Sequence, residues 1–133
     1  MDMGAKRILI VDDALIMRRR IRDVAEQAGW RVAGEAKDGR EAVALYQEIR
    51  PDLVTLDIVM PNLDGVSALK TIVGNDPRAR VIMVSAVNQK AKLEECIQAG
   101  AIDFIVKPFD KASLLGMFEK YLDEASSQQE APR

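Results

Sequence analysis

The chain has 133 residues, of which 48% are hydrophobic and 30% are charged, the composition of a single globular domain. It contains no histidine and one cysteine, which excludes an imidazole base, a histidine metal ligand, a phosphohistidine and an internal disulfide. The net charge of -2 disfavours nucleic acid or an anionic membrane surface as a direct partner. Any chemistry must come from carboxylates, hydroxyls, lysine, arginine or the backbone.

Five short apolar runs rich in Val and Ile predict strands that are buried on both faces. They comprise residues 7–11, 31–36, 53–57, 81–85 and 103–106. The stretches between them carry apolar residues at helical spacing. This alternation predicts an α/β fold of the (βα)5 type, with a parallel sheet covered by helices on both faces.

Glycines follow three of the helical stretches, where a left-handed residue commonly ends a helix. They are Gly29, Gly74 and Gly100. No apolar run is long enough to cross a bilayer, so we expect a cytoplasmic protein without membrane insertion. Residues 125–133 are polar and lack apolar periodicity, which favours a flexible tail or the beginning of a linker after a domain at 5–124.

Polar residues gather where the predicted strands end. Asp12 and Asp13 follow the first strand, Asp57 ends the third, Ser85 ends the fourth and Lys107 follows the fifth. Parallel strands present their carboxyl ends at one edge of an open sheet, where such folds bind ligands. Three carboxylates at one edge need a proton or a cation, and an all-oxygen ligand set suits Mg²⁺. With a lysine and a hydroxyl beside them, the set indicates phosphoryl transfer to a carboxylate.

Each residue alone also has a structural interpretation. Asp12 and Asp13 could cap a helix, Ser85 could be a structural hydroxyl, and Lys107 could be a solvated charge. Asp57 resists such an account, because a charge at a buried strand end is costly without a partner. The convergence of all of them favours a site.

Five separated blocks resemble the receiver domain of two-component response regulators, and most closely the stand-alone chemotaxis regulators of the CheY-like kind. They are Asp12-Asp13, the segment 33–43, the segment 57–65 that begins with Asp57, Ser85-Ala86, and the segment 99–109 that contains Lys107-Pro108-Phe109. The resemblance covers residues 5–124. It implies the flavodoxin-like strand order 2-1-3-4-5.

The resemblance also implies a role for each site residue. Asp57 is the phosphoacceptor, Asp13 and Asp57 bind Mg²⁺ (or Mn²⁺) directly, and Asp12 binds it through a water. The backbone carbonyl of Val59 is a further metal ligand. Ser85 and Lys107 bind the phosphoryl group. The protein would be a phosphoacceptor switch and not an enzyme with an external substrate.

Further implications concern the switch and the partners. Phe104 takes the place of the family's switch aromatic, with plain core packing as the alternative, and the Lys107–Pro108 peptide is expected to be cis. The donor would be a histidine kinase or phosphotransfer protein. The output partner, the flagellar motor or a similar assembly, would bind the face of the fourth helix, fifth strand and fifth helix. Val59 and Val87 are apolar where many relatives carry polar side chains, which predicts slow hydrolysis of the phosphoryl group.

Several alternatives stay open. The chain could be the receiver module of a longer regulator with an effector domain, for example a DNA-binding one. A flavodoxin-like FMN carrier would need phosphate donors where Asp12 and Asp13 lie, and a magnesium phosphatase would show a D-x-D spacing that is missing here. Four arginines between positions 18 and 22 form a solvated face, with a docking surface for the phosphodonor or a DNA contact as alternatives.

Overall fold

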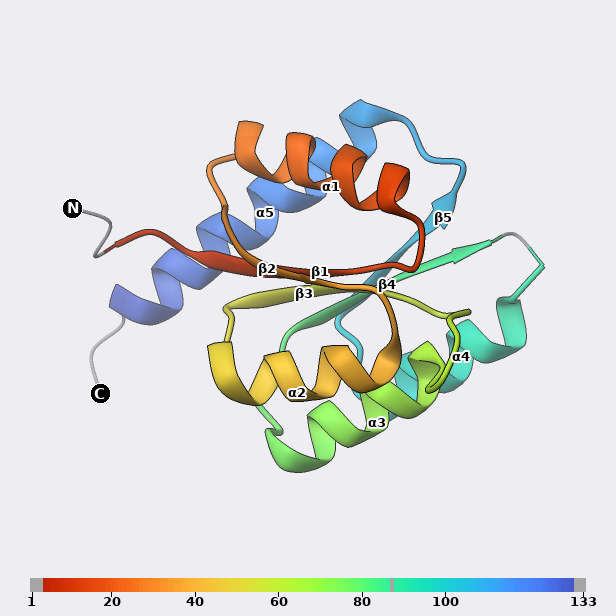
Figure 1. Ribbon diagram of the computed structural model, residues 1–133. Helices are drawn as coiled ribbons and strands as arrows, with labels where there is room; N and C mark the ends of the chain where they lie inside the picture. Colours follow the sequence, from red (N-terminus) through yellow and green to blue (C-terminus); the bar gives the residue numbers. More distant parts are fainter. Residues whose placement is uncertain (1–3, 87, 131–133) are drawn as a thin grey trace.

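The computed structural model describes residues 4–86 and 88–130, which form five strands alternating with five helices (Figure 1). The strands are β1 (Arg7–Val11), β2 (Arg31–Ala36), β3 (Leu53–Asp57), β4 (Val81–Ala86) and β5 (Asp103–Lys107). The helices are α1 (Leu15–Gln27), α2 (Gly39–Ile49), α3 (Gly65–Asn75), α4 (Lys90–Ala99) and α5 (Lys111–Glu130). The predicted strands therefore lie where expected, with β4 and β5 each one residue longer.

All strand pairs are parallel, and the strand order is β2-β1-β3-β4-β5. This confirms the predicted (βα)5 fold and its strand order. The order reverses between β1 and β3, because the chain first moves outward to β2 and then returns to β3 on the other side of β1. Ligands bind such sheets beyond the carboxyl ends of the strands at this point.

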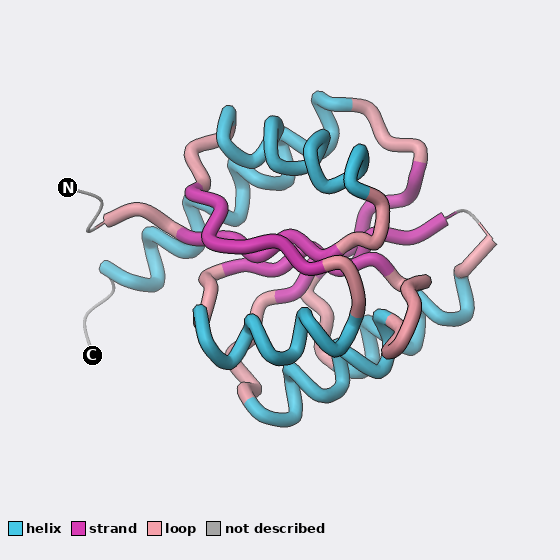
Figure 2. Tube along the Cα trace, in the orientation of Figure 1, coloured by secondary structure: helices cyan, strands magenta, loops and turns pink. Residues whose placement is uncertain are grey.

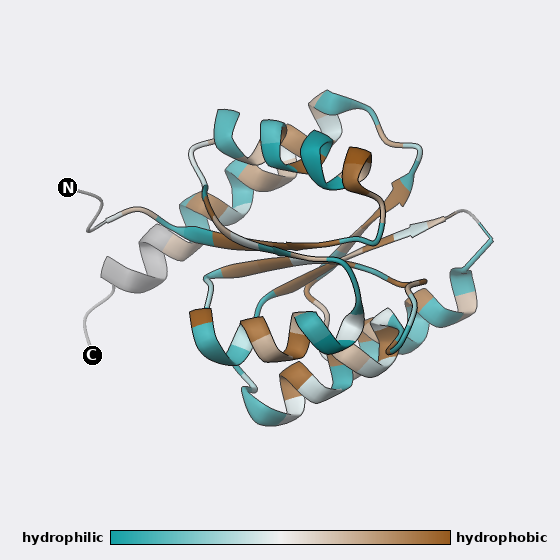
Figure 3. Cartoon of the chain, in the orientation of Figure 1, coloured by the Kyte–Doolittle hydropathy of each residue, from teal (hydrophilic) through white to brown (hydrophobic). Residues whose placement is uncertain are grey.

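Helices cover both faces of the sheet, with α1 and α5 on one face and α2, α3 and α4 on the other (Figure 1). Each face holds its own apolar core. One core contains Ile8, Ile10 and Phe118, and the other contains Leu9, Leu56 and Met83. The strands between the layers are mostly apolar (Figure 3), as expected for strands without a solvated face.

The loops that follow β1, β3 and β5 gather at one edge of the sheet (Figure 2). This edge carries the acidic residues, and the layered core beneath fixes its geometry. Among the described residues, no helix has the length and apolar character needed to cross a membrane.

Two of the three predicted glycine helix ends are confirmed. Gly29 (φ 105°) and Gly100 (φ 119°) adopt left-handed backbone just after α1 and α4. The prediction is wrong for Gly74, which lies inside α3; this helix continues to Asn75 and is followed by Asp76 in extended backbone. A single glycine is tolerated in a helix when its neighbours pack well.

Helix α5 continues past residue 124 to Glu130, into the segment expected to be a tail. Ala125 is buried against the α1–α5 core, so packing continues at least one residue past the expected end of the domain. Residues 131–133 lie outside the described residues. A role of this segment as a linker stays a prediction.

Candidate functional site

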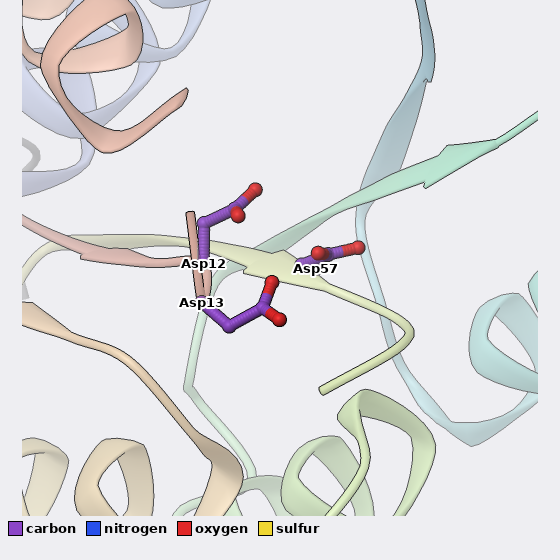
Figure 4. A group of neighbouring side chains, drawn as sticks. All are labelled: Asp12, Asp13 and Asp57. Carbon is purple, nitrogen blue, oxygen red and sulfur yellow. The ribbon is translucent and has the colours of Figure 1, made fainter. Parts of the chain in front are cut away.

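The three predicted carboxylates lie together at the carboxyl edge of the sheet. Asp12 and Asp13 follow β1, Asp57 ends β3, and one carboxylate oxygen from each residue lies within 4.8 Å of the others (Figure 4). Asp12 and Asp57 are buried, whereas Asp13 is exposed. The pocket therefore has a fixed inner wall and one carboxylate at its solvent side.

Asp12 forms hydrogen bonds through its backbone and through both carboxylate oxygens. Its N–H donates to the Ala36 carbonyl (3.0 Å), and its carbonyl accepts from Nη1 of Arg18 (2.7 Å). Its Oδ1 accepts from the Ala14 N–H (2.9 Å), and its Oδ2 accepts from Nζ of Lys107 (3.0 Å). The N-cap of α1 is Ala14, with no side-chain cap, so Asp12 and Asp13 are not its capping residues.

Lys107 reaches from β5 across the sheet edge to two of the carboxylates. Its Nζ lies 3.0 Å from Oδ2 of Asp12 and 3.4 Å from Oδ2 of Asp57. The peptide bond between Lys107 and Pro108 is cis, as expected. Lys107 is therefore no solvated charge; it is the cation that offsets the repulsion between the two buried carboxylates.

The titration of these groups reflects their burial and their charges. Burial, and next the charge of Asp12, raise the pKa of Asp57 against the opposing effect of Lys107. Burial also acts to lower the pKa of Lys107, but the hydrogen bond to Asp12 and the charge of Asp57 outweigh it and raise that pKa. The pocket has more negative charge than one lysine balances.

Ser85 ends the buried part of β4 next to this pocket. Its side chain is 1% exposed, and its hydroxyl has no hydrogen-bond partner among the described residues. Leaving a buried hydroxyl without a partner costs about 1–3 kcal/mol. Such a group at a sheet edge is suited to a ligand that supplies the missing partner.

Phe104 on β5 is 42% exposed, so the alternative that it is a core residue is wrong. A cavity of about 350 Å³ lies between its ring and the end of β4. The cavity is lined by Ser85, Ala86, Lys90, Leu93, Phe104 and Val106. Ser85 and Phe104 thus line the same space, as a coupled serine and aromatic would require.

The loop between β3 and α3 is fixed by close backbone contacts at two glycines, Gly65 and Gly39. The Gly65 N–H donates to the Ile58 carbonyl (2.7 Å), and a Cβ at Gly65 would lie 2.1 Å from the Asp57 carbonyl oxygen. A Cβ at Gly39 would lie 1.9 Å from the Leu63 carbonyl oxygen. Both positions need glycine because backbone approaches too closely for a side chain.

The arginines of α1 do not form a uniform solvated face. Arg18 and Arg22 donate to the two carboxylate oxygens of Glu35, at 2.9 and 2.8 Å, whereas Arg19 and Arg20 are exposed. The interpretation as a solvated face is therefore wrong for Arg18 and Arg22. The pairing of these arginines with Glu35 on β2 could not be predicted from the sequence. It depends on how α1 crosses the strand in the folded protein.

The donor set fits a hard divalent cation. Three carboxylates converge beside a single lysine, and the described residues of this cluster offer only oxygen ligands. Mg²⁺ takes one or two carboxylates together with waters. Asp13 and Asp57 would hold it directly and Asp12 through a water. These roles, and the Val59 carbonyl as a ligand, stay predictions.

The raised pKa of Asp57 predicts a pH-dependent effect of Asp57→Asn without divalent cations. At pH 7.5 the wild type must bury an ionised Asp57, which costs free energy. The free energy of unfolding of Asp57→Asn should therefore exceed that of the wild type, by on the order of 1 kcal/mol. Below the native pKa the wild-type carboxyl takes up its proton, so the difference should shrink as the pH falls. Urea unfolding at pH 7.5 and pH 4 measures it, and a variant of lower stability at pH 7.5 would contradict the origin given for the shift.

A comparison with protein families matches residues 8–119 to the response regulator receiver domain. The chain belongs to this family. The receiver is 50% identical to the chemotaxis protein CheY of Thermotoga maritima over 115 residues, which are 86% of this chain and 96% of that protein. It is also 50% identical to Bacillus subtilis CheY over 119 residues, covering 90% of this chain and 99% of that protein.

Solved structures agree with this membership. The receiver superposes with a TM-score of 0.81 on a chain of the CheX–CheY–BeF3–Mg²⁺ complex from Borrelia burgdorferi, at 34% identity. The match covers 98% of this chain and 94% of that chain. The resemblance stated from the sequence motifs is thereby confirmed for the family, and the relatives from Thermotoga maritima and Bacillus subtilis are chemotaxis proteins.

Proposed function

We propose that the receiver is a phosphoacceptor switch of a chemotaxis-type two-component system, with Asp57 as the acceptor. The proposal rests on the carboxylate of Asp57, which lies within 4.8 Å of carboxylate oxygens of Asp12 and Asp13 and 3.4 Å from Nζ of Lys107. A carboxylate in this setting can attack phosphorus while cations on either side offset the negative charge. Mg²⁺, when bound, would supply further charge neutralisation to the transferring phosphoryl oxygens.

The transfer exchanges one bond to phosphorus for another. Because the chain has no histidine, the phosphohistidine belongs to a kinase or phosphotransfer protein. An oxygen of Asp57 forms the new P–O bond, the P–N bond to the donor imidazole breaks, and the imidazole nitrogen keeps the electron pair and takes up a proton. Hydrolysis later returns the carboxylate and releases phosphate.

The phosphoryl group would then bind the two groups left beside it. Lys107 already points at Asp57, and the Ser85 hydroxyl lacks a partner that a phosphoryl oxygen would supply. Movement of Ser85 would vacate space beside the cavity of about 350 Å³, into which the exposed Phe104 ring can turn. Phosphorylation shifts the population only because these contacts exist in one state and not in the other.

The output surface would be the face of α4, β5 and α5. It carries the exposed apolar side chains of Ile97 and Phe104, and the Phe104 ring changes its exposure in the proposed switch. The Borrelia CheY is described in a complex with CheX, which supports a protein partner. The alternative of a receiver module in a longer regulator would change the output but not the chemistry at Asp57.

A small phosphodonor tests the acceptor function without the cognate kinase. Acetyl phosphate with Mg²⁺ should add one phosphoryl group per chain, stable to acid and labile to base, measured by intact mass spectrometry. Omitting Mg²⁺ with EDTA should abolish it. A chain that takes up no phosphoryl group, or the same amount with EDTA, would refute the proposal.

The phosphoryl group should be long-lived because Val59, beside Asp57, cannot orient a water. Its apolar side chain is 51% exposed; Val87, the second apolar position, lies outside the described residues. We expect Val59→Asn to speed dephosphorylation about tenfold by placing a polar group at the attacking water. The decay of the phosphorylated form measures it, with Ile97→Asn as a control at another exposed apolar position, on α4. Equal decay in Val59→Asn and wild type would show that this position does not set the lifetime.

A further inference from the structure

The fixed geometry around Asp12 contrasts with that of Asp13. All four hydrogen-bonding groups of Asp12 are engaged, and its side chain is 1% exposed. The exposed carboxylate of Asp13 has no hydrogen bond or ion pair within 4–86 and 88–130. No side-chain contact holds the Asp13 carboxylate, so the backbone sets the region that it can reach, beginning with the peptide unit that joins it to Asp12.

Arg18 holds that peptide unit. Its Nη1 donates to the Asp12 carbonyl at 2.7 Å, and its Nε donates to Oε1 of Glu35 at 2.9 Å. One guanidinium thus joins the β1–α1 loop to β2. A planar guanidinium presents several N–H groups in fixed directions, so anchoring one of them orients the others.

Glu35 and Arg22 hold Arg18 in turn. Oε2 of Glu35 accepts from Nε of Arg22 at 2.8 Å, so each carboxylate oxygen binds one arginine. Burial acts to raise the pKa of Glu35, but the bonds to Arg22 and Arg18 lower it overall, so this residue is ionised near neutral pH. The Arg18 side chain is 15% exposed, low for an arginine on a helix that faces solvent on one side.

We infer that Arg18 is a positioning residue for the metal site, which it serves by fixing the Asp12–Asp13 peptide so that the Asp13 carboxylate faces Asp57. This inference rests on the proposed function, because it concerns the cation that the three carboxylates would share. The loop is held in place before the cation binds, when the carboxylates repel each other. Arg18 contacts neither cation nor phosphoryl group; it acts through the backbone.

The test is the affinity for Mg²⁺, measured by ¹H–¹⁵N NMR titration of the full chain. We expect Arg18→Met to raise the dissociation constant about tenfold, the usual scale for residues that orient metal ligands. Arg19→Met is the matched control, because it removes the same charge from the next position of α1 at an exposed site. It should change the constant less than twofold. Arg18→Met should also speed hydrogen exchange of the Ala14 amide, which donates to Oδ1 of Asp12, without Mg²⁺.

Glu35→Gln provides a second variant if Arg18→Met does not fold. It keeps the shape but weakens the anchor of Arg18, and we expect a threefold rise of the dissociation constant. Equal Mg²⁺ affinities of Arg18→Met and Arg19→Met would overturn the positioning role and leave only a long-range charge effect. An unmodified chain that binds no Mg²⁺ would overturn the proposed function as well.

Discussion

Gly65→Ala should destabilise the receiver by about 3 kcal/mol and disable the acidic pocket at the same time. A Cβ at position 65 would lie 2.1 Å from the Asp57 carbonyl oxygen and 2.7 Å from the Ile58 Cα. Both are backbone atoms, so no side-chain rotation can relieve the clash. Overpacking of this kind forces the backbone to shift. The shift would move the peptide of Asp57 itself. Urea unfolding measures the loss, and phosphorylation by acetyl phosphate measures the damage to the site.

Gly74→Ala is the matched control for this variant. A Cβ at Gly74 would meet nothing within 4 Å, and the residue lies in the same helix, α3. Alanine is the better helix former, so we expect Gly74→Ala to gain up to about 1 kcal/mol. If both variants were equally stable, the close approach of Gly65 to the Asp57 backbone would not be what requires glycine.

Lys107→Met should be the most damaging change of charge in the pocket. Asp12 is 1% exposed and would lose its ion-pair partner, which we expect to cost about 2 kcal/mol, less than a fully buried pair because Lys107 is partly exposed. The loss of its positive charge should slow phosphorylation about 100-fold. Lys111→Met, an exposed lysine at the start of α5, should leave both quantities almost unchanged.

The stability difference between wild type and Lys107→Met should depend on pH in the alkaline range. The pKa of Lys107 is raised by its acidic partners, so its contribution is complete below the ordinary lysine pKa of about 10.4 and is lost as the pH rises through the native pKa. The stability gap between wild type and Lys107→Met should therefore hold from pH 7 to about pH 10 and narrow above it. A gap that stayed constant to pH 12 would show that packing, and not charge, is responsible.

The sequence predicts which functional residues lie at the edge of the sheet better than it predicts the contacts that hold them there. Parallel strands end at one edge, so knowing where each strand ends was enough to bring Asp12, Asp57 and Lys107 together. The order of the strands came from the resemblance to the family, because apolar runs do not specify which strand lies beside which. The exposure of Phe104 could not be predicted either, since it depends on how α4 packs beside β5.

The supporting contacts join segments that lie far apart in the chain. Arg18 and Glu35 meet only after α1 is laid across β2, and Asn62 donates to Asp38 only after the β3–α3 loop folds back to α2. None of these pairs has a spacing that a helix or strand would repeat. Helix α5 is another case of a contact between distant segments. Its residues after 124 are polar and predict no helix, but α5 continues to Glu130 and Ala125 is buried against the core.

Mapping the modified residue shows most directly whether Asp57 is the phosphoacceptor. The receiver is phosphorylated with acetyl phosphate and Mg²⁺, treated with borohydride to reduce an aspartyl phosphate to homoserine, and digested for tandem mass spectrometry. We expect homoserine at position 57 alone and no phosphoryl group on Asp57→Asn. Homoserine at Asp12 or Asp13, or a phosphoryl group that persists in Asp57→Asn, would contradict it.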